Sequence, residues 1–185
     1  ILDIARKNGV QIPSLCHHPD FCAKSNCRVC VVEIAGQKKM ATSCSTIAEE
    51  EMEVFTDTEK VKKSRNLNME FIYAEHVEKC QTCTFRYDCY LLKNANKYKL
   101  NINTFRDRKR KRKTYKFANS VEIDGSQCID CRNCIDACSL LQNINYLEIK
   151  GKGIHQEIVP ISDKNIDWID KKDLSAIAYT RGPGL

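Results

Sequence analysis

Cysteine is the residue whose number and spacing in this sequence point most directly to chemistry. There are 12 cysteines among 185 residues, and a chain so rich in cysteine is either a disulfide scaffold or a metal protein. Cysteines separated by only two residues usually converge on a metal centre instead of bridging distant segments. Four such pairs occur: Cys27/Cys30, Cys80/Cys83, Cys128/Cys131 and Cys131/Cys134. We therefore expect a metal-binding protein in a reducing, cytoplasmic compartment, either free or at the periphery of a membrane complex.

The first pattern, Cys16-x10-Cys27-x2-Cys30-x13-Cys44, supplies the four thiolates that a 2Fe-2S cluster needs. It is flanked by small or polar residues, among them Ser25 and Asn26, which let backbone N–H groups turn toward the sulfurs. Cys22 complicates the assignment, because Cys22-x4-Cys27-x2-Cys30 also matches the plant-type ferredoxin spacing. The spacing alone leaves Cys16 and Cys22 as alternatives, and a zinc site on the same cysteines is a further one. Either Cys16 or Cys22 would thus join Cys27, Cys30 and Cys44 as the ligands of this 2Fe-2S cluster.

The second pattern combines one histidine with three cysteines, His76-x3-Cys80-x2-Cys83-x5-Cys89. A 4Fe-4S cluster takes four protein ligands, and three cysteines alone would leave one iron open. His76 precedes Cys80 by one helical turn, so both side chains lie on one face if the helix continues. A neutral imidazole in place of a thiolate removes a negative charge, which should raise the reduction potential. We expect these four residues to bind a 4Fe-4S cluster.

The third pattern, Cys128-x2-Cys131-x2-Cys134-x3-Cys138, is the bacterial ferredoxin run. In that geometry the first three cysteines bind one 4Fe-4S cluster and the fourth reaches a neighbouring cluster. No cysteine follows Cys138, so the ligand sets are incomplete within this sequence. Ser139 also stands where the bacterial pattern has proline.

Charge and hydropathy narrow the class of protein further. The formal net charge is +6, from 30 Lys and Arg against 24 Asp and Glu, and the run from Arg106 to Lys116 (RDRKRKRKTYK) is strongly basic. We interpret this run as a solvated connector that could dock an acidic partner. Binding to nucleic acid is weakly supported, because Tyr115 is its single aromatic residue. No apolar run approaches the roughly 18 residues of a membrane span.

Hydrophobic patterning divides the chain into three cysteine-bearing units. In the first, 1–57, a short helix should end at Asn8-Gly9, and strands are expected at 29–34, 38–42 and 52–55. In the second, 58–103, Thr58 is a good N-cap for a helix running to Glu75. Its expected apolar face carries Val61, Leu67, Phe71 and Ala74. The basic connector (104–116), the third unit (117–170) with a strand at Val121–Ile123, and a tail (171–185) follow.

The three patterns in this order resemble an iron-sulfur arm shared by several oxidoreductases: the G subunit of NADH dehydrogenase, iron-only hydrogenases, related formate dehydrogenases and diaphorase subunits. The matching segments are ILDIARKNGVQIPSLCHHPD, SNCRVCVVEI, HVEKCQTC and CIDCRNCIDAC. In this family the cysteine of the LCxHP segment is the first 2Fe-2S ligand, so the resemblance favours Cys16 over Cys22. Departures from the family are Ser25, where glycine is common, and the stretch from Phe85 to Asp88, which lacks the usual glycine.

The resemblance implies an α+β fold in three parts. A β-grasp 2Fe-2S ferredoxin domain, here without its N-terminal hairpin, would precede a small helical 4Fe-4S domain with one His and three Cys ligands and an incomplete ferredoxin-like 4Fe-4S domain. The presence of Cys138, with the segment GKGIHQEIVPISDKNIDWID, favours the hydrogenase-like branch. The tail KDLSAIAYTRGPGL resembles, over about fourteen residues, the tRNA threonylcarbamoyladenosine-forming ATPase family, and we interpret it as chance or a fused end.

Taken together, the motifs predict an electron-relay module of an NADH-dehydrogenase-like or hydrogenase-like oxidoreductase. Its expected partner is a flavin-containing, NADH-oxidising subunit or a hydrogen-cluster domain. The alternatives are a zinc-stabilised nucleic-acid-binding module and a diaphorase or formate dehydrogenase iron-sulfur subunit. We find no phosphate-binding glycine loop with lysine and no nucleophile motif, so no catalytic residue is predicted.

Overall fold

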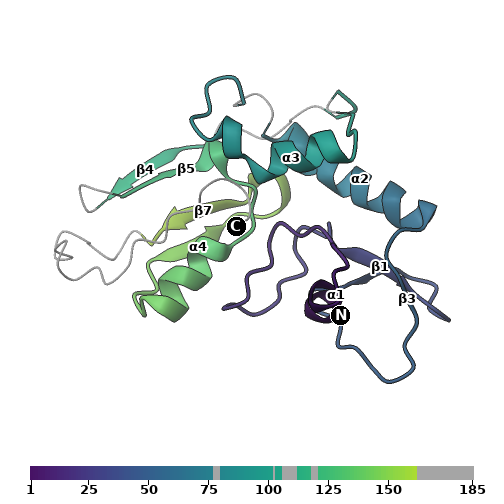
Figure 1. Cartoon of the computed structure of the whole chain (residues 1–185). Coiled ribbons are helices and arrows are strands. Elements are labelled where there is room, and N and C mark those ends of the chain that lie inside the picture. Colours follow the sequence, from purple (N-terminus) through teal and green to yellow (C-terminus); the bar gives the residue numbers. More distant parts are fainter. Residues whose placement is uncertain (77–79, 102, 106–111, 118–120, 162–185) are drawn as a thin grey trace.

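The computed structural model describes residues 1–161 apart from four short internal segments: 77–79, 102, 106–111 and 118–120. These residues form several helices and three small antiparallel sheets (Figure 1), which confirms the expected mixture of helix and strand. Within the described residues, no helix is both long and apolar enough to cross a membrane. The tail over 171–185 and most of the basic run lie outside the described residues.

The N-terminal unit is a three-stranded antiparallel sheet with one short helix beside it (Figure 1). Helix α1 (Leu2–Lys7) is followed by strands β1 (Val31–Ile34), β2 (Ala41–Thr42) and β3 (Val54–Phe55), in the sheet order β2-β1-β3. All three strands fall inside the predicted segments but are shorter than predicted. The apolar core beneath the sheet is formed by Leu2, Ile12, Cys30 and Val32, so a predicted cluster cysteine is part of the packing.

Helix α2 (Glu59–Ala74) begins directly after the predicted N-cap, Thr58, and packs against the first unit. The Thr58 hydroxyl accepts a hydrogen bond from the Val61 N–H at 3.2 Å, which satisfies one of the free donors of the first turn. Arg65 is buried and donates to the carbonyl oxygens of Thr56 at 2.9 Å and Val31 at 3.4 Å. These bonds fix α2 against the edge of the first unit.

The predicted apolar face of α2 is partly wrong. Leu67 and Phe71 remain 42% and 48% exposed, respectively. The buried face instead follows four-residue steps and includes a charged side chain: Val61, Arg65, Met69 and Tyr73, with Ala74 beside them. Sequence patterning excluded Arg65 because of its charge, whereas the structure pairs that charge with two carbonyl groups.

A second helix completes the middle unit and closes its core. A 3₁₀ turn (η2, Arg86–Asp88) leads into α3 (Tyr90–Lys97), and α3 packs against α2. The core between them draws residues from two units: Leu15 and Val29 from the first, and Met69, Tyr73, Cys89, Leu91 and Ala95 from the second. Ile129, from the third unit, packs against the same core.

The third unit contains two hairpins and a short helix. Strands β4 (Thr114–Phe117) and β5 (Val121–Asp124) pair antiparallel, and η3 (Gly125–Gln127) follows. Helix α4 (Asn133–Asp136) continues as a π-helical turn, η4 (Ala137–Leu141). The rest of the unit is a second hairpin: β6 (Leu147–Lys150), the 3₁₀ turn η5 (Gly153–His155) and β7 (Glu157–Pro160).

The boundary between the connector and the third unit differs from the prediction. Strand β4 begins at Thr114, inside the segment 104–116 that we expected to be a solvated connector. Arg112, just before β4, also has a side chain that is only 7% exposed. The C-terminal end of the basic run is therefore part of the folded unit.

Candidate metal centres

The four cysteines of the first pattern are brought together as two pairs. The Cys27 N–H points at the Cys16 sulfur at 3.5 Å, and the thiols of Cys16 and Cys27 share a hydrogen bond. The thiols of Cys30 and Cys44 form the second pair. Cys16 and Cys30 are buried, whereas Cys27 and Cys44 are partly buried. A 2Fe-2S cluster has two irons with two protein ligands each, so two close sulfur pairs fit its donor set.

In each pair, one thiol has a lowered pKa and the other a raised pKa. The hydrogen bond from the Cys27 thiol lowers the pKa of Cys16 to about 6, and that from the Cys44 thiol lowers the pKa of Cys30 to about 6. The pKa values of Cys27 and Cys44 are raised, first by donating these bonds and then by burial. Iron ligation replaces the thiol proton and would supply the positive charge that favours all four thiolates.

Cys22 occupies a different environment from Cys16. Its side chain is exposed, whereas that of Cys16 is 1% exposed and lies beside Cys27. The loop that holds Cys27 is shaped by left-handed backbone conformations at Ser25 (φ 53°) and Arg28 (φ 51°). Ser25 is also held by its side chain, which accepts a hydrogen bond from the Thr42 hydroxyl at 3.0 Å. The geometry therefore supports Cys16 as the partner of Cys27.

The cysteines of the second pattern lie between α2 and α3. The Tyr73 hydroxyl is 3.8 Å from the Cys80 sulfur, and Cys89 is buried in the shared core. Burial raises the pKa of the Cys80 thiol, and the charges of Cys89 and Cys83 also raise it. Cys80 also packs against the core that contains Cys89.

His76 is a buried imidazole without a hydrogen-bond partner for Nδ1. Its side chain is 5% exposed, and Nδ1 is fully covered by protein. Burial lowers its pKa, which keeps the ring neutral, although the nearby Asp124 acts in the opposite direction. A buried, unpaired and neutral ring nitrogen has the properties of a metal ligand. Residues 77–79, which join His76 to Cys80, lie outside the described residues.

In the third pattern, Cys128, Cys131 and Cys134 are partly buried. Burial raises the pKa of Cys128 to about 11 and that of Cys134 to about 12, and it also raises that of Cys131. The charges of Cys131 and Cys128 add to the increase in the pKa of Cys134. Cys138 lies in the π-helical turn, where its sulfur accepts a hydrogen bond from the Tyr146 N–H at 3.1 Å.

A buried ion pair from the basic run supports the third pattern. The Arg112 guanidinium binds the Asp130 carboxylate at 2.7 Å, and both side chains are at most 15% exposed. Arg112 also donates to the Cys128 carbonyl at 3.4 Å, and the Asp130 N–H donates to the Cys128 sulfur at 3.3 Å. The sequence did not single out Arg112, because it stands among other basic residues, although its position next to a strand was a usable signal.

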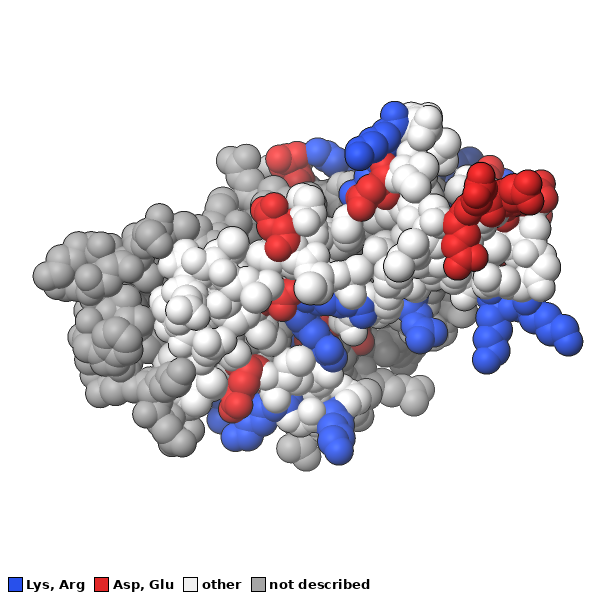
Figure 2. Space-filling view, turned by 90° about the horizontal axis from the view of Figure 1, so that it is seen from below, with Lys and Arg blue, Asp and Glu red and all other residues white. Residues whose placement is uncertain are grey.

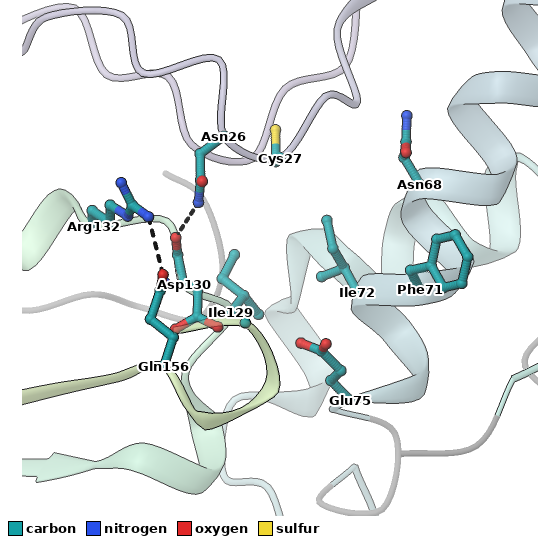
Figure 3. Close-up of a pocket in the computed structure, with 11 residues that line it drawn as sticks. Asn26, Cys27, Asn68, Phe71, Ile72, Glu75, Ile129, Asp130, Arg132 and Gln156 are labelled. Atoms are coloured by element: carbon teal, nitrogen blue, oxygen red, sulfur yellow. Dashed lines mark hydrogen bonds between the residues drawn. The ribbon is translucent and has the colours of Figure 1, made fainter. Parts of the chain in front are cut away.

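The first and third sites are adjacent, although about 100 residues separate their cysteines. The Asn26 side-chain amide donates to the Asp130 carbonyl oxygen, which joins residues that directly precede Cys27 and Cys131. Figure 3 shows this bond at the edge of a cavity of about 400 Å³. All three units line the cavity, with Cys27 from the first, Ile72 from α2 and Ile129 from the third.

A site for a single metal ion would need at least three ligating side chains close together. Over the part of the chain that the structure describes, no three His, Cys, Asp or Glu side chains gather closely enough to hold one ion. All 12 cysteines are free thiols in the structure.

On the face shown in Figure 2, basic side chains lie between and beside acidic ones.

Comparison with known proteins agrees with this geometry. Residues 1–59 match the family described as the 2Fe-2S iron-sulfur cluster binding domain. The chain is 31% identical over 159 residues to the G subunit of NADH-quinone oxidoreductase from Rickettsia typhi, covering 86% of this chain and 24% of that protein. It is 27% identical over 161 residues to the NADH-ubiquinone oxidoreductase 75 kDa subunit of Dictyostelium discoideum, covering 85% and 23%. The chain thus spans about a quarter of the length of these relatives.

A solved structure has the same fold over most of the chain. It is a crystal structure of an NAD+-reducing [NiFe]-hydrogenase in the H2-reduced state, with a TM-score of 0.79 and 29% sequence identity. The alignment covers 88% of this chain and 68% of the hydrogenase chain. The predicted homology to the G subunit of NADH dehydrogenase and to a hydrogenase is confirmed, although the matched hydrogenase is a [NiFe] enzyme and the prediction named iron-only hydrogenases. The choice between the branches of the family stays a prediction.

Proposed function

We propose that this chain relays single electrons through protein-bound iron-sulfur clusters, as its homology to the G subunit of NADH-quinone oxidoreductase and to a chain of an NAD+-reducing hydrogenase suggests. The observation that carries the proposal is the pairing of Cys16 with Cys27 and of Cys30 with Cys44 inside a 2Fe-2S cluster binding domain. When bound, each cluster takes up and releases one electron. The protein's part is to hold the ligands, exclude water and tune the potential.

Two further ligand sets would extend the relay with 4Fe-4S clusters. The first consists of His76, Cys80, Cys83 and Cys89, and its support is the buried, unpaired Nδ1 of His76 together with the burial of Cys89. The second consists of Cys128, Cys131 and Cys134, supported by their partial burial and by the N–H group of Asp130 that donates to the Cys128 sulfur. Cys138 is turned toward Tyr146, so we assign it to a separate site from these three.

The chain needs an electron donor and an acceptor, which we place on partner subunits. The names of its relatives describe subunits of NADH-oxidising and NAD+-reducing enzymes, so a flavin-containing, NADH-linked subunit fits as one partner. The other partner would be a quinone-linked or hydrogen-cluster-containing unit. Twelve unpaired cysteines fit a reducing compartment, and we propose a cytoplasmic location at the periphery of a larger complex.

The decisive experiment isolates the full chain without oxygen and measures iron, acid-labile sulfide and the electron paramagnetic resonance (EPR) spectrum after reduction. We expect a brown protein with iron, sulfide and a reducible 2Fe-2S signal. A colourless protein that holds only zinc would contradict the relay and would favour the zinc-stabilised alternative.

A matched pair of variants tests the ligand assignment. Cys16→Ser should abolish the 2Fe-2S signal, because it removes one sulfur of the first pair. Cys22→Ser should retain the signal, because its side chain is exposed and away from Cys27. The opposite pattern, with loss of the signal in Cys22→Ser only, would show that the plant-type spacing holds the cluster instead.

A further inference from the structure

Lys24 crosses from the first cluster-binding loop to the third. It belongs to the loop between Cys16 and Cys27, and its ammonium group pairs with the Asp136 carboxylate on α4. It also donates to the Asn133 side-chain oxygen at 2.9 Å. The Lys24 side chain is only 12% exposed and that of Asp136 is 22% exposed. The ion pair is therefore partly withdrawn from solvent, where charges interact more strongly than at an open surface.

The polar partners of Lys24 lie on the helix that carries a cysteine of the third pattern. Helix α4 begins two residues after Cys131 and contains Cys134. On the other side, the Phe21 ring lies 5.2 Å from the Lys24 ammonium. Among the described residues, the carboxylate that pairs with Lys24 is that of Asp136.

The position of Lys24 in the chain supplies the second contact. Lys24 lies three residues before Cys27, and its two partners, Asn133 and Asp136, flank Cys134. One ammonium group thus connects the loop of the first pattern to the helix that carries a cysteine of the third.

We propose that Lys24 is a positioning residue shared by two redox sites. Its charge raises the reduction potentials of both sites, and the carboxylate of Asp136 reduces the size of that increase. The inference rests on the proposed relay function. When one electron passes between the sites, one site is oxidised by one electron and the other is reduced by one, and no bond forms or breaks. The added electron is a negative charge, and a fixed cation between the sites stabilises it on either side.

This role predicts shifts of opposite sign for the two members of one ion pair. Lys24→Gln removes the cation and should shift both midpoint potentials to more negative values. Asp136→Asn removes the moderating anion and should shift both to more positive values. Lys24→Arg keeps the charge and should restore potentials near those of the wild type. If the pair only docked the two units, both single removals would disturb the sites in the same direction or leave the potentials unchanged.

The test is a redox titration of the full chain, isolated without oxygen and followed by EPR at fixed pH and ionic strength. Lys39→Gln is the matched control, because that lysine is exposed and makes the same change in net charge. Negative shifts at both sites in Lys24→Gln, a positive shift in Asp136→Asn and none in Lys39→Gln would support the inference.

Three outcomes would overturn it, and they differ from failure of the relay itself. Unchanged potentials in Lys24→Gln, an equal shift in Lys39→Gln, or a negative shift in Asp136→Asn each contradict a shared cation. If Lys24→Gln does not assemble, the sign of the Asp136→Asn shift and the potentials of Lys24→Arg still decide. A wild-type chain without iron and sulfide would contradict the proposed function, and this inference with it.

Discussion

The residues that flank the cluster cysteines adopt a backbone conformation that side chains rarely allow. Ser25 and Arg28 surround Cys27, and Asp130 and Arg132 surround Cys131, all with φ between 51° and 63°. This region costs residues other than glycine about 1–2 kcal/mol each. In such a turn successive N–H groups point to the inside of the loop, as the Asp130 N–H does toward Cys128. A glycine at the position of Ser25 would adopt this conformation without that cost.

Arg28 offers a direct test of this strain, because its side chain is exposed. Arg28→Gly removes about 1 kcal/mol of strain and loosens the unfolded chain by about 0.5 kcal/mol. We therefore expect a net gain of about 0.5 kcal/mol, seen as a higher thermal midpoint by circular dichroism. Arg28→Ala is the control and should give no gain, since alanine is strained in the same way. Equal midpoints for the two variants would show that φ at this position is not strained.

His76 provides the test of the mixed ligand set. Replacing a neutral imidazole by a thiolate adds one negative charge to the cluster, so His76→Cys should shift the midpoint potential of that site to more negative values. His76→Ala should weaken or abolish its EPR signal. His155→Cys is the control, because His155 is an exposed residue of the third unit. A His76→Ala chain with an unchanged signal and potential would remove His76 from the ligand set.

At the level of elements, the start of α2 fixes the first unit to the second. The Glu33 carboxylate on β1 accepts hydrogen bonds from the Thr58 hydroxyl and from Lys60, the latter at 2.8 Å. The bond to Lys60 is the main reason that the pKa of Glu33 is lowered, and the bond to Thr58 adds to it. The same threonine therefore caps the helix and anchors it to the sheet.

The lowered pKa of Glu33 predicts a pH dependence with a definite sign. A carboxyl group whose pKa is lower in the folded state stabilises the fold above its unfolded pKa, here 4.5, and loses that effect as the pH falls through the folded pKa. Glu33→Gln should therefore lower the thermal midpoint at pH 6, and the difference from wild type should shrink as the pH falls below 4.5. Glu53→Gln, an exposed residue, is the control. A difference that is constant with pH would contradict the link.

At the scale of the whole molecule, one apolar core contains or contacts residues from all three cysteine patterns. Leu15, next to Cys16, and Val29, between Cys27 and Cys30, pack with Tyr73, Leu91 and the cluster cysteine Cys89. Ile129, from the loop between Cys128 and Cys131, packs against the same core. The three cysteine patterns are therefore connected by packing against a common apolar core.

This shared core predicts that damage in the second unit reaches the first. Leu91 is 1% exposed, and truncating a buried leucine to alanine typically costs about 2–5 kcal/mol. Leu91→Ala should therefore lower the temperature at which the 2Fe-2S absorbance is lost, although Leu91 is far from those cysteines in the sequence. Asn96→Ala, an exposed position of the same helix, should leave that temperature nearly unchanged. Loss of absorbance at the wild-type temperature in Leu91→Ala would mean that the units unfold independently.

The sequence by itself predicted the metal chemistry, because cysteine spacing reports which candidate ligands lie within a few residues of one another. It also determined local structure such as the Thr58 cap and the strand after Cys30. The tertiary structure alone decided what depends on contacts across long sequence separations. It placed the Cys16 sulfur next to the Cys27 N–H, buried Arg65 on the inner face of α2, and brought Asn26 against the loop of Cys131. Local patterns carry no information on such contacts, because they form only when separate units pack together.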